Sequence, residues 1–194
     1  MAPAPASAFD VSVSRVAVTS SRVIATLELR ELLRDHFLQV VQQGRAVFVQ
    51  VQADLWEDRR FADRLALTTP QLTFRIDRAV DRGVVLVDQF GTRTEHPDLD
   101  APLPMLVDLG PEAALADDRS YYVQAEVTAA TVAERDLQQA GAAFLGDPQS
   151  AEGLAGLGRF VFRTLLRIGQ YLDTAAATAT SRTISGAAIR GGRN

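Results

Sequence analysis

The sequence contains no cysteine, so neither a disulfide framework nor a catalytic thiolate is possible. Proteins of the cytoplasm and of the periplasm can both lack cysteine, and the redox compartment stays open. The 194 residues are 47% hydrophobic, with 13 glycines and 8 prolines. This composition is typical of one globular domain that buries a substantial core.

Lysine is also absent, and all 20 basic residues are arginine. Coding in a GC-rich genome explains this bias, and selection for bidentate anion binding is the alternative. A Walker phosphate loop is impossible without lysine, and no Gly-x-Gly-x-x-Gly follows a strand. The Gly-x-Ser-x-Gly of a nucleophile elbow is missing too. The sequence therefore disfavours phosphate-binding enzymes and α/β-hydrolases of these types, and we expect no cofactor.

The N-terminus lacks the charged and apolar segments of a signal peptide, and none is expected in the chain as written. Its alanines and prolines predict a flexible leader over residues 1–10. Such a leader is typical of the region before a mature domain, which favours a periplasmic or membrane-associated location.

The stretch Arg45 to Trp56 has the clearest strand pattern and the only tryptophan. Apolar residues recur with a period of two, as in a half-buried antiparallel strand. One face carries Val47, Val49, Val51, Ala53 and Leu55. The other face, expected to be mostly solvated, carries Phe48, Gln50, Gln52, Asp54 and Trp56.

The same alternation predicts two hairpins and a further strand. The predicted strands are Val11 to Thr19, Arg22 to Arg30, Gln71 to Val80, Val84 to Phe90 and Ser120 to Thr128. A helical period over Glu31 to Gln43 predicts an amphipathic helix, and Gly44 stands where its C-terminal cap belongs. Residues 57–67 fit either a short helix or the beginning of a strand.

Residues 91–118 contain four prolines and many acids, and we expect a long loop there. A short apolar piece at Met105 to Leu109 and a helical turn from Pro111 to Ala116 interrupt it. Helices are expected from Thr131 to Leu145 and from Leu154 to Leu172. The predicted class is mainly β, an antiparallel β-sandwich with flanking α-helices and a C-terminal helical tail.

Charge divides the chain unevenly. Residues 1–155 carry 14 arginines against 23 acids, whereas residues 156–194 carry six arginines against one aspartate. The predicted organisation is therefore a leader over 1–10, a β-sandwich domain over 11–148 and a basic helical tail over 149–194.

Arginines spaced by four residues form one stripe of the predicted C-terminal helix. They are Arg159, Arg163 and Arg167, and the apolar neighbours Phe160 and Leu165 accompany them. Three arginines in a segment of this length argue against a transmembrane helix. Docking to an anionic membrane surface or a protein partner is one interpretation, and packing on the sheet with solvated arginines is the other.

An acidic loop around His96 is a weaker candidate for ligand or metal binding. Its members are Asp88, Glu95, His96, Asp98, Asp100 and Asp108. The spacing lacks the glycine of a calcium loop, so a solvated acidic loop is favoured and no metal is expected. His36 is expected on a helix surface or in the core, and Trp56 over the edge of the core.

The order of hairpin, helix from Leu32 to Gln43, Gly44 and valine-rich strand ending at Trp56 resembles a bacterial envelope family known only as a domain of unknown function. The resemblance covers residues 11–128. That family has several tryptophans after the strand where this chain has one. The resemblance implies an exported β-rich domain and brings no known activity.

These features favour a non-enzymatic binding or scaffolding module at the cell envelope. Its partner would be a protein or an anionic membrane surface, whereas nucleic acid is disfavoured because the body is acidic and the arginines are not interleaved with aromatic residues. Two alternatives stay open: a ligand-binding or hydrolytic domain that uses the acidic loop, and a structural subunit of a larger assembly or oligomer.

The docking interpretation makes a testable prediction. Deletion of residues 150–194 is expected to leave a folded monomer that no longer sediments with anionic vesicles or binds its partner. Vesicle binding retained by the deleted protein would contradict docking through the tail.

Overall fold

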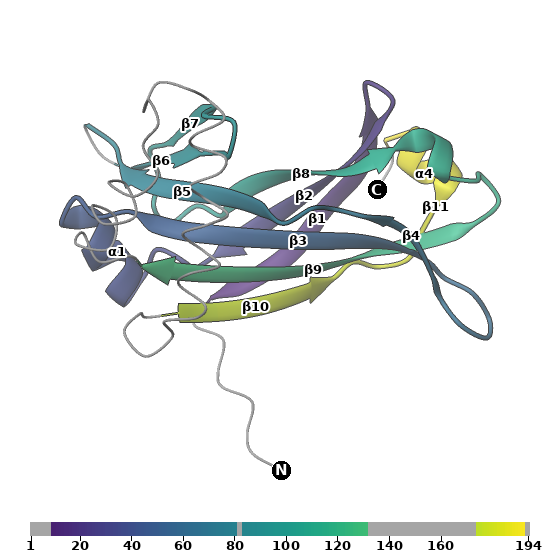
Figure 1. Cartoon of the computed structure of the whole chain (residues 1–194), viewed down its shortest axis with the longest axis horizontal. Helices are drawn as coiled ribbons and strands as arrows, with labels where there is room; N and C mark the ends of the chain where they lie inside the picture. The colour runs from purple at the N-terminus through teal and green to yellow at the C-terminus, as the bar shows by residue number, and fades with distance from the viewer. Residues whose placement is uncertain (1–8, 81–82, 132–173, 193–194) are drawn as a thin grey trace, which may run out of the picture.

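The computed structural model describes residues 9–80, 83–131 and 174–192, which form two antiparallel sheets packed face to face (Figure 1). The larger sheet has the strand order β10-β9-β3-β5-β6-β7, with β4 and β11 as short additions on β3 and β9. The smaller sheet has the order β1-β2-β8. The predicted class, a mainly β antiparallel sandwich, is confirmed.

The bounds of the elements follow chain order. They are β1 (Asp10–Thr19), β2 (Arg22–Arg30), α1 (Asp35–Gln42), β3 (Val47–Glu57), β4 (Arg64–Thr68), β5 (Leu72–Arg78), β6 (Val84–Val87), β7 (Arg93–His96), β8 (Leu103–Pro111), the 3₁₀ turn η1 (Glu112–Ala114), β9 (Ser120–Thr131), β10 (Thr174–Thr180), β11 (Ile184–Ser185) and α4 (Gly186–Arg190). Both predicted hairpins are confirmed, β1 with β2 and β5 with β6.

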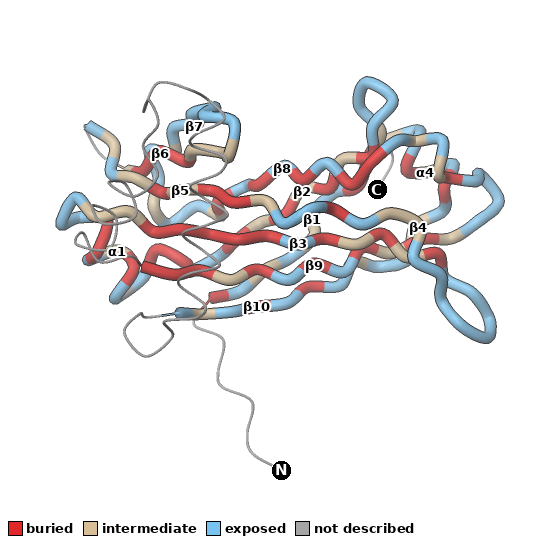
Figure 2. Tube along the Cα trace, in the orientation of Figure 1, coloured by how far each residue is buried: buried red, intermediate tan, exposed pale blue. Residues whose placement is uncertain are grey.

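Buried residues recur along the strands of both sheets (Figure 2) and build one core. In β3 the inward row is Val47, Val49, Val51, Ala53 and Leu55. The smaller sheet contributes Val23, Ala25, Leu27 and Leu29 from β2 and Leu103, Met105, Val107 and Leu109 from β8. Because strand residues point alternately to opposite faces, the long strands β2, β3, β8 and β9 give the core every second side chain.

The outer face of β3 is less solvated than the alternation predicts. Phe48 and Gln50 are each only 8% exposed, although they lie outside the core cluster. Phe48 sits between Ala130 of β9 and Arg75 of β5 in the sheet. The expectation of a mostly wet second face therefore holds for exposed Gln52 but is wrong for the first half of the strand.

Strands β4 and β5 act as one strand interrupted at Pro70. Both run antiparallel to β3, β4 beside its end and β5 beside its beginning. At the interruption the Thr69 hydroxyl accepts a hydrogen bond from Ala53 N and donates one to Ala53 O, both at 2.9 Å. The hydroxyl thus satisfies the N–H of Ala53 where Pro70, which has no N–H, interrupts the ladder. Residues 64–68 are thus strand, and the alternative of a short helix is wrong.

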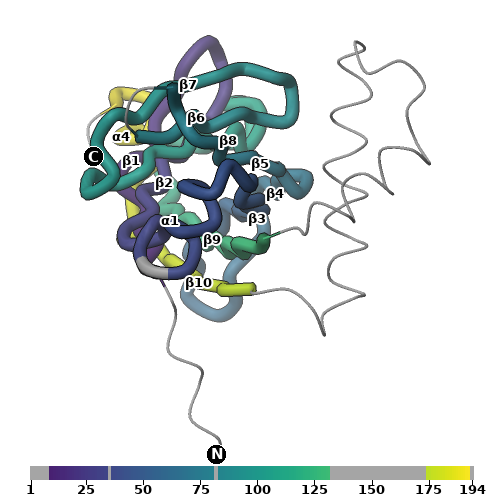
Figure 3. The backbone as a smooth tube through the Cα atoms, turned by 90° about the vertical axis from the view of Figure 1, so that its left-hand side faces the viewer, coloured from purple at the N-terminus to yellow at the C-terminus, as the bar shows by residue number. Residues whose placement is uncertain are grey.

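Helix α1 is shorter than predicted and lies across one end of the sandwich (Figure 3). Glu31 has a φ of 63°, so residues 31–34 form a turn, and the helix begins at Asp35. At the other end Gly44 N bonds to Val41 O and Arg45 N to Val40 O, the pattern of a Schellman cap. The predicted cap at Gly44, whose φ is 78°, is confirmed.

The expected long loop over 91–118 is wrong, because it contains β7 and β8. Prolines predict a loop in this stretch, but Pro104 and Pro111 lie in β8. Among the described strands, β8 pairs only with β2, and an edge strand tolerates proline because one row of its N–H groups has no partner in the sheet. The helical turn expected near residue 112 is present as η1.

The end of the chain belongs to the sandwich rather than to a separate helical tail. The small-residue run Thr174–Thr180 forms β10, which pairs with β9 in a register from Thr174 opposite Ala130 to Thr180 opposite Gln124. Alternating threonine and alanine suit an edge strand that buries only small side chains, Ala177 and Ala179. Deletion of residues 150–194 would remove β10 from the sandwich. This deletion therefore does not test the predicted tail alone.

The other predicted helices, Thr131 to Leu145 and Leu154 to Leu172, lie outside the described residues, except that Thr131 is the last residue of β9. Neither α1 nor α4 has the length and apolar character needed to cross a membrane.

The packing of α4 makes a prediction about stability. Ile189 is 0% exposed in α4, and a buried isoleucine replaced by alanine costs about 2–5 kcal/mol. We therefore expect Ile189→Ala to lower the urea midpoint clearly. Leu106→Ala in β8 is the control, since Leu106 is 67% exposed and its loss should change stability by less than about 0.5 kcal/mol. Equal midpoints for the two variants would show that α4 does not contribute to the core.

Candidate ligand-binding pocket

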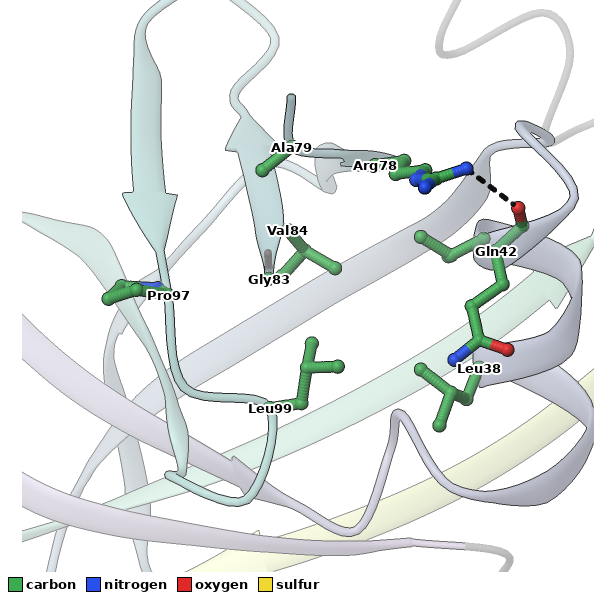
Figure 4. A pocket seen from close by; sticks show the side chains of 9 residues that line it. Leu38, Gln42, Arg78, Ala79, Gly83, Val84, Pro97 and Leu99 are labelled. Carbon is green, nitrogen blue, oxygen red and sulfur yellow. Dashed lines mark hydrogen bonds between the residues drawn. The ribbon is translucent and has the colours of Figure 1, made fainter. Parts of the chain in front are cut away.

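A cavity of about 460 Å³ lies between α1, the β5–β6 hairpin and the segment after β7 (Figure 4). Ligand pockets commonly have volumes of roughly 300–1,000 Å³. Its apolar lining consists of Leu38 and Val41 from α1, Ala79 and Val84 from the hairpin, and Pro97 and Leu99 beyond β7. The other described residues in the lining are Gly83, Gln42 and Arg78. In the described part of the chain the cavity is therefore a mostly aliphatic chamber with one cationic side chain.

Backbone contacts hold the walls in place. Ala79 N bonds to Gly83 O at 3.2 Å, which closes the turn between β5 and β6. Gly83 has a φ of 98°, and a Cβ there would lie 2.1 Å from His96 O and 2.7 Å from Pro97 Cα. The wall formed by β7 thus approaches β6 so closely that only glycine fits.

Arg78 closes the inward-facing row of β5. Phe74 and Ile76, two and four residues earlier, belong to the core, and Arg78 lies opposite Val84 of β6. Its NH1 donates to the carbonyl of Gln42 at 3.3 Å, at the C-terminal end of α1. Figure 4 shows this hydrogen bond spanning the gap between the hairpin and the helix. The guanidinium is therefore positioned at the cavity by two elements.

His96 lies beside this cavity without lining it. Its Nε2 is buried and has no hydrogen-bond partner among the described residues. Burial lowers the pKa of His96, because desolvation disfavours the imidazolium. The ring is therefore neutral at physiological pH and adds little charge to this end of the molecule.

The acids predicted to accompany His96 do not converge on it. Asp88 accepts hydrogen bonds from Phe90 N and Thr92 N, which shapes the β6–β7 turn. Asp108 pairs with Arg22 at 2.8 Å in the other sheet. Within residues 9–80, 83–131 and 174–192, no three His, Asp or Glu side chains come together as a metal site would require.

A second polar cluster lies at the opposite end of β3, around the buried carboxylate of Glu57. Arg59 binds both carboxylate oxygens, at 2.8 and 2.9 Å, and Arg64 and Arg119 lie at 3.3 and 3.7 Å. The hydrogen bonds from Arg59 lower the pKa of Glu57, and the charges of the three arginines add to this effect. The cluster ties the ends of β3 and β4 to the loop before β9, a structural role.

Two residues singled out in the sequence have ordinary positions. His36 is exposed on α1, which confirms the helix-surface interpretation. Trp56 is half-buried opposite Tyr122, on the outer face of the larger sheet. The bulge between β3 and β4 lies in β4, so the alternation of β3 is unbroken at Trp56. Trp56 therefore lies on the outer face of the sheet and does not cover the edge of the core, contrary to expectation.

The residues predicted to bind a partner or membrane lie outside the described residues. They are Arg159, Phe160, Arg163, Leu165 and Arg167.

Comparison of the chain with protein-family models, with curated proteins and with solved structures finds no match. The resemblance to an envelope family therefore stays a prediction.

Sequence reasoning missed the cavity because four separate segments line it. Leu38 and Val41 have the pattern of core residues in a helix, Pro97 and Leu99 fall in the expected long loop, and Arg78 has the pattern of a solvated charge at a strand end. No local pattern in the sequence links these segments to one another.

The contact at Gly83 gives a prediction with a matched control. Gly83 and Gly91 both have positive φ, 98° and 86°, but nothing lies within 4 Å of a Cβ built at Gly91. Alanine at either site costs about 1–2 kcal/mol of backbone strain. Gly83→Ala should cost about 1–3 kcal/mol more, because the methyl group collides with β7. Urea unfolding measures both, and equal losses would contradict the close approach of β7.

Proposed function

We propose that this protein is a non-enzymatic binding domain that takes a small, largely apolar molecule in the cavity beside α1. The observation that carries the proposal is the 460 Å³ chamber whose walls are mostly aliphatic. Ligand-binding clefts are lined mostly by apolar side chains with a small number of polar groups. A chamber of this size and lining, open to solvent at one end of the sandwich, supports ligand binding.

The chemistry of the lining favours binding over catalysis. Of the nine described residues that line the chamber, only Gln42 and Arg78 have polar side chains. Neither is a nucleophile, and an arginine stays protonated and so does not serve as a general base. Pro97 and Leu99 come from the acidic segment after His96, so that segment supports ligand binding through its apolar residues.

Docking at the cell envelope stays a separate prediction, and the fold changes how it must be tested. Residues 174–192 are part of the sandwich, so the arginine stripe has to be altered by substitution rather than deletion. The suitable variant replaces Arg159, Arg163 and Arg167 with glutamate and leaves β10 intact. Loss of sedimentation with anionic vesicles would support docking, and unchanged sedimentation would contradict it.

The binding proposal is tested by filling the chamber. Octanol is a neutral apolar probe, and calorimetric titration should show one site on the unaltered protein. Ala79→Trp places a large ring inside the chamber, and we expect octanol affinity to fall at least about tenfold, or 1.4 kcal/mol. Ala62→Trp, on the exposed loop between β3 and β4, is the control and should bind as before.

Thermal melting of both variants shows that the fold is intact. Octanol bound equally by the unaltered protein and by Ala79→Trp, or not bound at all, would contradict the proposal.

A further inference from the structure

We infer that the ligand of this chamber carries a single anionic group, a carboxylate or phosphate, which Arg78 binds at the chamber's edge. The inference rests on the proposed binding function and names the chemical class of the ligand. It describes a small amphiphile whose apolar part lies among the aliphatic side chains and whose head meets the guanidinium.

Arg78 lies where the inward-facing row of β5 reaches the chamber. Phe74 and Ile76, earlier in that row, belong to the core, whereas Arg78 is exposed at the end of the strand. The chamber begins at this point, so an exposed cation stands at the edge of a space with aliphatic walls.

No carboxylate pairs with Arg78 in the described part of the chain. There the guanidinium donates one hydrogen bond, to the neutral carbonyl of Gln42. Asp77, its neighbour, lies on the opposite face of β5 and pairs with Arg75 at 2.7 Å. A guanidinium has five N–H donors, and within the described residues one of those of Arg78 is used.

Glu57 differs from Arg78 in its surroundings. It too ends an inward row, that of β3, but it is buried and three arginines surround its carboxylate. Arg78 is exposed and donates one hydrogen bond to a carbonyl in the described part of the chain, so its guanidinium can accept an anionic partner from solution. Arginine binds carboxylate and phosphate with two parallel hydrogen bonds, which makes these groups the expected complement.

The alternative role of Arg78 is structural, as a cation at the negative end of the α1 dipole. The two roles differ in a measurable way. A structural role affects every ligand of the chamber equally, whereas an anion-binding role affects only the charged one.

The experiment compares octanoate with octanol, which share an apolar tail and differ in charge. Calorimetric titration of the unaltered protein should give at least about tenfold tighter binding of octanoate, as expected for hydrogen bonds to a charged group. Arg78→Gln keeps a donor for the Gln42 carbonyl but loses the charge. It should abolish the preference by weakening octanoate alone. Arg182→Gln, exposed in the segment between β10 and β11, is the control for loss of one positive charge.

A second titration uses octyl phosphate, so that binding of a phosphate head group is compared with binding of a carboxylate. Tighter binding of either octanoate or octyl phosphate than of octanol supports the inference. Equal binding of octanoate, octyl phosphate and octanol by the unaltered protein would overturn the inference and leave the proposed function standing. Equal weakening of all three ligands in Arg78→Gln would overturn it in favour of the structural role. No binding of any of them would overturn the proposed function and the inference together.

Discussion

The rest of the structure depends on the pairing of β3 with β9. Eleven consecutive residue pairs join them, from Val47 opposite Thr131 to Glu57 opposite Tyr121. Both strands bury a full row of side chains, so a register shift of one residue would turn each row toward solvent. β4 and β5 extend the sheet on one side and β10 and β11 on the other, while β1, β2 and β8 cover the inner face.

This central pair also explains why the two ends of the molecule differ. At one end the inward row of β3 finishes in Glu57, and the surrounding arginines compensate the buried carboxylate. At the other end the sheet continues into the short strands β6 and β7, and α1 crosses beside them without filling the space. The chamber and Arg78 lie where the second layer of the sandwich gives way to a helix.

Much of this fold is predictable from alternation alone, as the β1–β2 hairpin and the inward row of β3 show. Strand prediction failed where the residue types are unusual for a strand but the position in the sheet accepts them. β8 contains two prolines that an edge strand tolerates, and β10 is built of alanine and threonine, whose small side chains give a weak hydrophobic signal. The chamber could not be predicted, because Leu38, Arg78 and Leu99 are distant in sequence and meet only through the packing of α1 on the hairpin.

The central claim is that the chamber beside α1 binds a small apolar molecule. The most direct measurement is the titration of isotopically labelled protein with octanoate, followed through backbone amide resonances. The account predicts saturable shifts confined to Leu38, Val41 and Gln42 of α1, to Arg78, Ala79 and Val84, and to Leu99. Shifts centred on β10 or on the Glu57 cluster, or no saturable shift at any site, would contradict it.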